Sequence, residues 1–198
     1  DGKKVREREG RLETLFSASS AASVPQRARA ILNESARYNI GPAVRNMNFP
    51  TLSLVFLHPR NQRRFAWKRG GARRFGTVEG LEVEFEEVER PTLVDQDGRG
   101  DLPAKGRFWI DPALGTVLRS ETTFRFEPAR ARAYVATQYR AEPRLALWVP
   151  AEMREEYEDL PAAPQPVFGS PSEATARYSN FRQFTVTIED ETARLPPE

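Results

Sequence analysis

Residues 106–121, GRFWIDPALGTVLRSE, contain two segments of alternating apolar and polar side chains on either side of a short turn. Alternation with a period of two is typical of half-buried antiparallel strands, because successive side chains of a strand point to opposite faces. Between the two segments, Pro112 presets φ, Asp111 can accept hydrogen bonds from nearby backbone N–H groups, and Gly115 can take a positive φ. The stretch therefore predicts a β-hairpin.

The same alternation predicts which side chains share a face of the sheet. Phe108 and Ile110 share one parity in the first strand of the hairpin, and Leu118 and Phe124 share one in the second. In residues 81–87, LEVEFEE, apolar residues alternate with glutamates in the same way. A β-bulge in the second strand of the hairpin would reverse this parity locally. The residues expected on one face are Val83, Phe85, Phe108, Ile110, Leu118 and Phe124.

Most of the chain after Pro50 has this strand-and-turn pattern, whereas residues 25–38 predict the one main helix. A proline suits the first turn of that helix, and Ile31 and Leu32 form a sparse apolar stripe. Many strands with one helix predict an α+β, mostly antiparallel β fold, in which a curved sheet or incomplete β-barrel packs against one main helix. We expect residues 1–198 to form a single domain, and the opening Asp-Gly turn suggests that N-terminal strands are missing.

The composition narrows the class of protein. The 198 residues are 39% hydrophobic and 29% charged, with a formal net charge of +2. This is a globular composition on the polar side, and no apolar run approaches the roughly 18 residues of a transmembrane helix. The chain has no cysteine, which removes disulfides, zinc–thiolate sites and thiol nucleophiles together.

Two oppositely charged segments bear on nucleic-acid binding. Residues 60–74 carry seven basic side chains interleaved with Phe65 and Trp67, a pattern found at nucleic-acid interfaces. Residues 79–89, however, carry six glutamates. If the two segments pair as strands, their charges face each other as cross-strand pairs. We favour this pairing and expect no nucleic-acid partner.

No set of residues points to catalysis or to a bound metal. His58 is the only histidine, and beside Pro59 it is typical of a capping or loop residue. Residues 94–101, VDQDGRGD, have the Asp and Gly density of a calcium loop but lack its full twelve-residue pattern. A hydrolase that uses scattered carboxylates is the least favoured alternative. We expect no enzymatic activity, no catalytic residue, no metal and no cofactor.

Aromatic side chains on or near the predicted strands are the most suggestive feature for function. An ordinary hydrophobic core would use them, and so would a sheet that curves around an apolar cavity. For the second case, the candidate ligand-binding residues of the concave apolar face are Phe56, Val83, Phe85, Phe108, Ile110, Leu118, Phe124 and Trp148.

Three segments also resemble a known family. The hairpin GRFWIDPALGTVLRSE is similar to one in bacterial lipoprotein-sorting and lipoprotein-carrier proteins, which have the LolA/LolB-like fold. Residues 176–186, ARYSNFRQFTV, resemble the segment that begins a late strand in that family. The strand pair from Tyr139 to Met153 resembles uncharacterised exported bacterial proteins more closely still.

The resemblance implies a non-enzymatic protein of the periplasm or cell envelope. In that fold an incomplete antiparallel barrel wraps a helix, and its concave face holds acyl chains. We therefore expect a periplasmic or exported binding protein whose partner is a lipid or lipoprotein acyl chain. The alternative is an envelope protein-interaction or sensor module, whose partner is another envelope protein and which binds no lipid. A lined apolar cavity would favour the first, and a filled core would favour the second.

Overall fold

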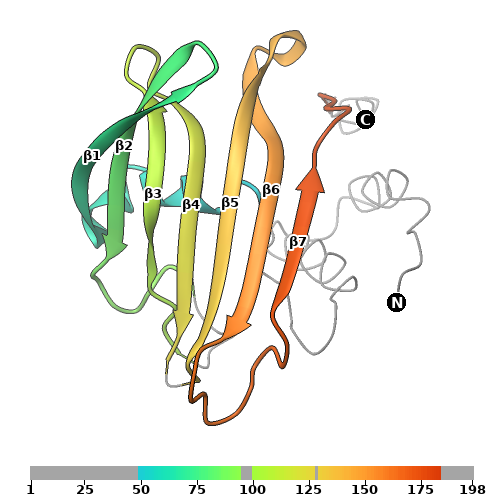
Figure 1. Ribbon diagram of the computed structural model, residues 1–198. Helices are drawn as coiled ribbons and strands as arrows, with labels where there is room; N and C mark the ends of the chain where they lie inside the picture. Colours follow the sequence, from blue (N-terminus) through green and yellow to red (C-terminus); the bar gives the residue numbers. More distant parts are fainter. Residues whose placement is uncertain (1–48, 95–99, 128, 184–198) are drawn as a thin grey trace, which may run out of the picture.

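The computed structural model describes residues 49–94, 100–127 and 129–183, and these form one seven-stranded antiparallel sheet (Figure 1). Strands that follow each other in sequence are neighbours in the sheet, so the topology is a meander from β1 to β7. The predicted antiparallel fold is confirmed, and the sheet is not closed into a barrel. The strands are β1 Phe65–Phe75, β2 Val78–Glu87, β3 Ala104–Asp111, β4 Thr116–Phe126, β5 Ala131–Glu142, β6 Leu147–Asp159 and β7 Ser172–Arg177.

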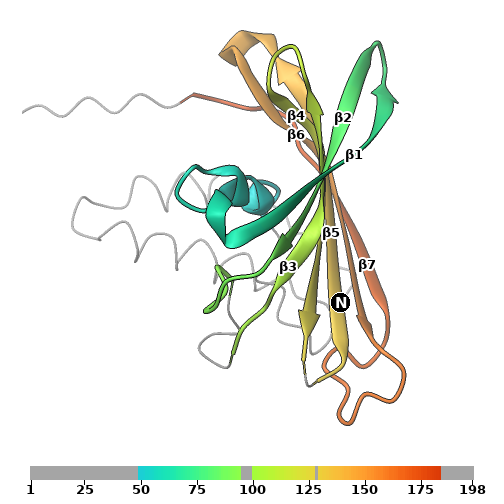
Figure 2. The ribbon, with the colours of Figure 1, turned by 90° about the vertical axis from the view of Figure 1, so that its left-hand side faces the viewer.

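The expected main helix is not seen in the described part of the chain. Residues 25–38, which predict it, lie outside the described residues. The described residues contain only short 3₁₀ helices, namely η1 Leu52–Leu57, η2 Gln62–Arg64 and η3 Pro143–Leu145. The apolar segment around Phe56 is η1, and it lies against one face of the strongly twisted sheet (Figure 2).

The predicted hairpin is confirmed as β3 and β4. The N–H of Ala113 donates to Asp111 Oδ1 over 2.8 Å, and the N–H of Gly115 donates to the carbonyl oxygen of Asp111 over 2.8 Å. Gly115 has a φ of 67°, in the left-handed region that favours glycine. The turn is therefore built as its residue types predict.

A β-bulge at Leu118 corrects one expected face assignment. Trp109 lies opposite Arg119 and Ile110 lies opposite Val117, so Leu118 is an extra residue in β4. Its Cδ1 atom lies only 3.0 Å from the position that a Cβ on Gly80 would take, which places Leu118 on the face of Trp109. Because the bulge falls at Leu118, Leu118 itself changes face.

The aromatic residues of the predicted face, Phe85, Phe108 and Phe124, lie on the face that η1 covers, as predicted. The ring centroids of Phe85 and Phe108 are 4.9 Å apart, and those of Phe56 and Phe65 are 5.0 Å apart. Phe124 belongs to the same buried cluster. Burial of each large side chain contributes about 1.5–3 kcal/mol to folding, so this cluster is the main apolar support of the sheet.

Candidate functional site

The chain itself, through η1, covers the aromatic part of the face that we predicted to bind a ligand. Phe56, Phe85, Phe108 and Phe124 are all buried in one cluster. One space between η1 and the sheet, bordered by Ser53, Thr122 and Phe124, has a volume of about 10 Å³, which is at the lower limit for a single water molecule. An acyl chain does not fit in this space.

The other four candidate residues are not brought together with this cluster in one ligand surface. Ile110 packs at its margin and Val83 is half-buried on β2. Leu118 is buried on the opposite face, at the bulge itself. Trp148 on β6 is 37% exposed, opposite Ala141. The structure therefore brings Val83 and Ile110 beside the cluster, whereas Leu118 lies on the opposite face and Trp148 lies on β6.

Buried hydroxyl groups hold η1 against the sheet, and the apolar–polar pattern did not predict them. The Ser53 hydroxyl donates to Ser120 Oγ over 2.9 Å. The Tyr139 hydroxyl donates to the carbonyl oxygen of Pro50 over 2.7 Å and lies 3.4 Å from Ser120 Oγ. The signal was present in β4, where Ser120 and Thr122 stand at positions with the parity of the apolar residues.

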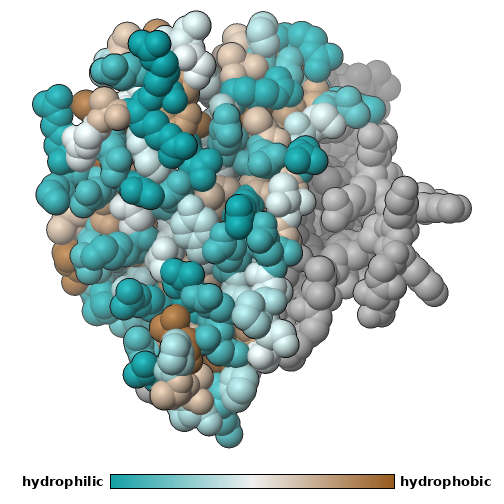
Figure 3. Space-filling model, viewed as in Figure 1, coloured by the Kyte–Doolittle hydropathy of each residue, from teal (hydrophilic) through white to brown (hydrophobic). Residues whose placement is uncertain are grey.

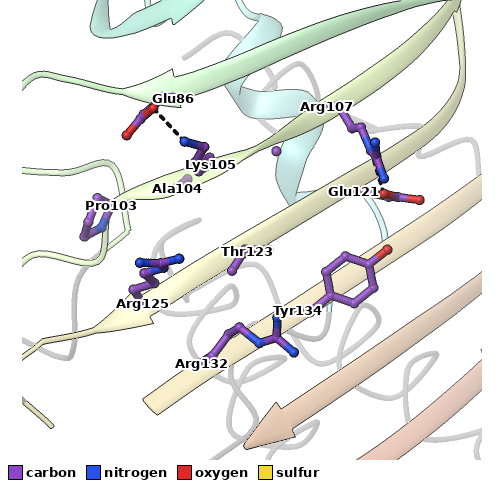
Figure 4. A pocket seen from close by; sticks show the side chains of 11 residues that line it. Glu86, Pro103, Ala104, Lys105, Arg107, Glu121, Thr123, Arg125, Arg132 and Tyr134 are labelled. Atoms are coloured by element: carbon purple, nitrogen blue, oxygen red, sulfur yellow. Dashed lines mark hydrogen bonds and ion pairs between the residues drawn. The ribbon is translucent and has the colours of Figure 1, made fainter. Parts of the chain in front are cut away.

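The opposite face of the sheet is polar and contains the more open hollow. Figure 3 shows this face covered mainly by hydrophilic side chains. A hollow of about 420 Å³ lies over β3, β4 and β5 (Figure 4). Four basic and two acidic side chains contribute to its lining. The lining residues are Glu86, Pro103, Ala104, Lys105, Gly106, Arg107, Glu121, Thr123, Arg125, Arg132 and Tyr134.

One end of the hollow is an ion cluster in which two arginines, Arg107 and Arg119, face two glutamates, Glu121 and Glu82. Glu121 accepts a hydrogen bond from Arg107 Nε and another from Arg119 Nε, each over 2.8 Å. Burial alone would raise the pKa of the Glu121 carboxyl, but these two hydrogen bonds and the positive charges of the two arginines together outweigh burial and hold the pKa below its ordinary value. The Arg107 guanidinium also lies 4.9 Å from the ring centroid of Trp109. Glu121 is therefore a positioned carboxylate with both oxygens engaged.

The other end of the hollow carries uncompensated positive charge. Arg125 on β4 lies directly opposite Arg132 on β5, and Thr123 lies directly opposite Tyr134. Arg132 Nη2 lies 2.7 Å from Glu158 Oε1. Arg125 is exposed and has no ion pair among the residues that the structure describes.

The predicted pairing of the basic and acidic segments is confirmed at the level of the strands. β1 and β2 pair antiparallel, and Lys68 Nζ lies 3.7 Å from Glu84 Oε2. Other glutamates of β2 turn to the third strand, since Glu86 pairs with Lys105 and Glu82 with Arg107. The glutamates therefore lie between two basic strands rather than facing β1 alone.

His58, the histidine weighed for catalysis, occupies an ordinary loop position. His58 is exposed, and its Nδ1 atom accepts a hydrogen bond from the backbone N–H of Arg60 over 3.3 Å. Within residues 49–94, 100–127 and 129–183, no three His, Asp or Glu side chains are grouped so as to hold a metal ion. Residues 95–99, most of the Asp- and Gly-rich stretch, lie outside the described residues.

Comparisons with protein-family models, with curated proteins and with solved structures found no significant match to this chain. In the described part of the chain, no helix has the length and apolar character needed to cross a membrane.

Proposed function

We propose that this protein is a non-enzymatic binding or interaction module that meets its partner on the outer surface of an open sheet. The observation that carries the proposal is the position of η1. Phe56 is 0% exposed within the aromatic cluster, and the space beside Ser53 and Phe124, between η1 and the sheet, is only about 10 Å³. A filled core leaves the outer surface of the sheet for recognition, and the polar face has the hollow of about 420 Å³.

The proposal that the module is not an enzyme is supported by the state of its best-placed carboxylate. Both oxygens of Glu121 accept hydrogen bonds from arginine side chains, and its pKa is held below the ordinary value by those bonds and the arginine charges against the effect of burial. A general acid needs a raised pKa near the working pH, and a general base needs a free oxygen that faces the substrate. Glu121 is suited to holding arginines in place instead.

An acyl-chain carrier in the cell envelope is the second candidate. It is supported by the resemblance of the hairpin at residues 106–121 to lipoprotein carriers and by the aromatic residues on one face of the sheet. Such a carrier would have to move η1 away, because Phe56 occupies the centre of that face. The periplasmic or exported location belongs to both candidates.

Native mass spectrometry of the full chain, purified from bacterial cells without detergent, distinguishes the lipid-free module from the acyl-chain carrier. We expect the mass of the chain alone, and we expect no fluorescence increase when the purified protein is mixed with a fluorescent fatty-acid analogue. A lipid that copurifies at one molecule per chain, or stoichiometric uptake of the analogue, would overturn the proposal in favour of the carrier.

A further inference from the structure

The register of β4 and β5 places two arginines side by side on the polar face. Arg125 and Arg132 are direct cross-strand partners. Cα atoms of such partners lie about 4.5–5.5 Å apart, so both side chains start from one small patch of the sheet. In Figure 4 the Arg132 guanidinium points toward Tyr134, and the exposed Arg125 side chain extends separately from the same patch. Like charges directly opposite each other destabilise an antiparallel pair. The pair is therefore one that a bound anion would stabilise.

The neighbouring carboxylates do not relieve this repulsion completely. Glu158 lies 2.7 Å from Arg132, and Glu86 lies 3.0 Å from Lys105 on the far side of the hollow. Arg125 is left without an ion pair among the described residues, while it lines the hollow together with Arg132 and Lys105. The excess charge at this end is positive and centred on Arg125.

We propose that this end of the hollow binds a phosphate-type oxyanion between Arg125 and Arg132. Guanidinium groups present forked N–H donors that match two phosphate oxygens at once, and a tetrahedral dianion can engage both arginines together. The Thr123 hydroxyl lies beside them on β4 and can donate a further hydrogen bond (Figure 4). The ligand is a free phosphate, a phosphomonoester or the phosphate of a lipid headgroup.

This inference rests on the proposed function, since it names the chemistry recognised on the outer face of the sheet. Titration calorimetry of the full chain with inorganic phosphate, and sedimentation with vesicles of phosphatidic acid or of phosphatidylcholine, form the two arms of the test. We expect Arg125-dependent binding in at least one arm, and that arm identifies the source of the phosphate group. We expect no binding to phosphatidylcholine alone.

The variants Arg125→Gln and Arg154→Gln form a matched pair. Arg154 is a half-exposed arginine on the same polar face, and it is paired with Glu156 and Glu173 outside the hollow. Loss of a charge-assisted hydrogen bond in Arg125→Gln should weaken binding about tenfold or more. Arg154→Gln should leave the affinity within about twofold, as expected for an arginine that does not contact the ligand.

Arg125→Glu adds a second measurement, the thermal midpoint, which needs no ligand. The new carboxylate would face Arg132, so we expect phosphate binding to disappear while the thermal midpoint holds or rises. Binding that falls equally in Arg125→Gln and Arg154→Gln, or that is absent in both arms, overturns the site. That result would leave the lipid-free module intact, because native mass spectrometry tests the filled core separately.

Discussion

The Ser53 hydroxyl on η1 donates a hydrogen bond of 2.9 Å to Ser120 Oγ on β4, and both η1 and β4 also contribute to the aromatic cluster. The two residues are 67 positions apart in the chain, and both are buried. This contact and the Tyr139–Pro50 hydrogen bond fix a short 3₁₀ helix over the centre of the sheet. A six-residue 3₁₀ helix has little intrinsic stability, so η1 depends on these side-chain contacts.

The Ser53–Ser120 contact can be tested by a double-mutant cycle. Either Ser53→Ala or Ser120→Ala leaves a buried hydroxyl with one partner fewer, and we expect each to lower the free energy of unfolding by about 1–2 kcal/mol. The double variant should cost less than the sum of the two, because both partners are then apolar. Urea unfolding followed by circular dichroism gives the three values.

Ser170→Ala is the control for this cycle, because Ser170 is exposed. It should change the unfolding free energy by less than about 0.5 kcal/mol. Strict additivity of Ser53→Ala and Ser120→Ala would show that the two hydroxyls do not interact.

Phe56→Ala should open a cavity in the aromatic cluster. Phe56 is 0% exposed and touches Phe65 and Phe85, so we expect a loss of about 3–5 kcal/mol in unfolding free energy. If the variant folds, it should gain binding of a small apolar probe such as benzene, measured by ligand-induced stabilisation. Val55→Ala is the matched control, since Val55 lies on the same helix and is 48% exposed. Equal effects of the two variants would mean that η1 does not fill the core.

The parity of side chains was enough to predict the antiparallel sheet and its central hairpin. Period-two alternation identified Phe85, Phe108 and Phe124 as residues of one face, and the structure confirms this. It could not place Leu118, because a bulge depends on the fit of two strands and not on the pattern of one. Local pattern therefore predicts strands and turns better than it predicts the register between them.

Asp111 and Gly115 should matter for folding and not for binding. Asp111 accepts a hydrogen bond from the N–H of Ala113, and Gly115 has a φ of 67°. Asp111→Ala removes that acceptor, and Gly115→Val puts a β-branched residue in the left-handed region, at a cost of about 1–3 kcal/mol. Thermal unfolding of both variants, with the 70% exposed Leu114 changed to Ala as control, checks the expectation. Unchanged midpoints for both would show that the turn tolerates a different geometry.

Gly106 should be far less tolerant of a side chain than Gly71, although both lie in strands. A Cβ on Gly106 would overlap the carbonyl oxygen of Glu121 and would lie 3.0 Å from the Phe85 ring, whereas a Cβ on Gly71 would have no neighbour within 4 Å. We expect Gly106→Ala to cost several kcal/mol or to prevent folding, since both the neighbouring strand and a packed core ring must move. Gly71→Ala should be close to neutral. Comparable soluble yield and thermal midpoint for the two variants would contradict the close approach of β3 and β4.

The polar hollow was harder to predict than the core. Its residues come from β2, β3, β4 and β5, and polar residues on a solvent-facing parity look alike in a sequence. Only the register shows that Arg125 meets Arg132 while Glu121 meets Arg107. The alternation predicts that these side chains point away from the core, and strand pairing decides which charges become neighbours.

Glu121 gives the polar face a defined dependence on pH. Hydrogen bonds from Arg107 and Arg119, together with the positive charges of these arginines, outweigh burial and hold the folded-state pKa of Glu121 below its ordinary value of 4.5. The folded state therefore binds this proton less readily than the unfolded state does. The stabilisation is complete above about pH 4.5 and is lost as the pH falls through the depressed folded-state pKa. Glu121→Gln removes the ionisation, so the difference in thermal midpoint between wild type and variant should be largest near neutral pH and should shrink below pH 4.5.

Asp159 also has a pKa below its ordinary value, because hydrogen bonds from the backbone N–H groups of residues 167–169 outweigh burial. Some acid sensitivity should thus remain in the variant, and the difference between the two curves isolates Glu121. Glu173→Gln, at an exposed ion pair with Arg154, should follow the wild-type curve closely. A difference between wild type and Glu121→Gln that stays constant from pH 7 to pH 3 would mean that Glu121 supports the sheet through its shape and not through its charge.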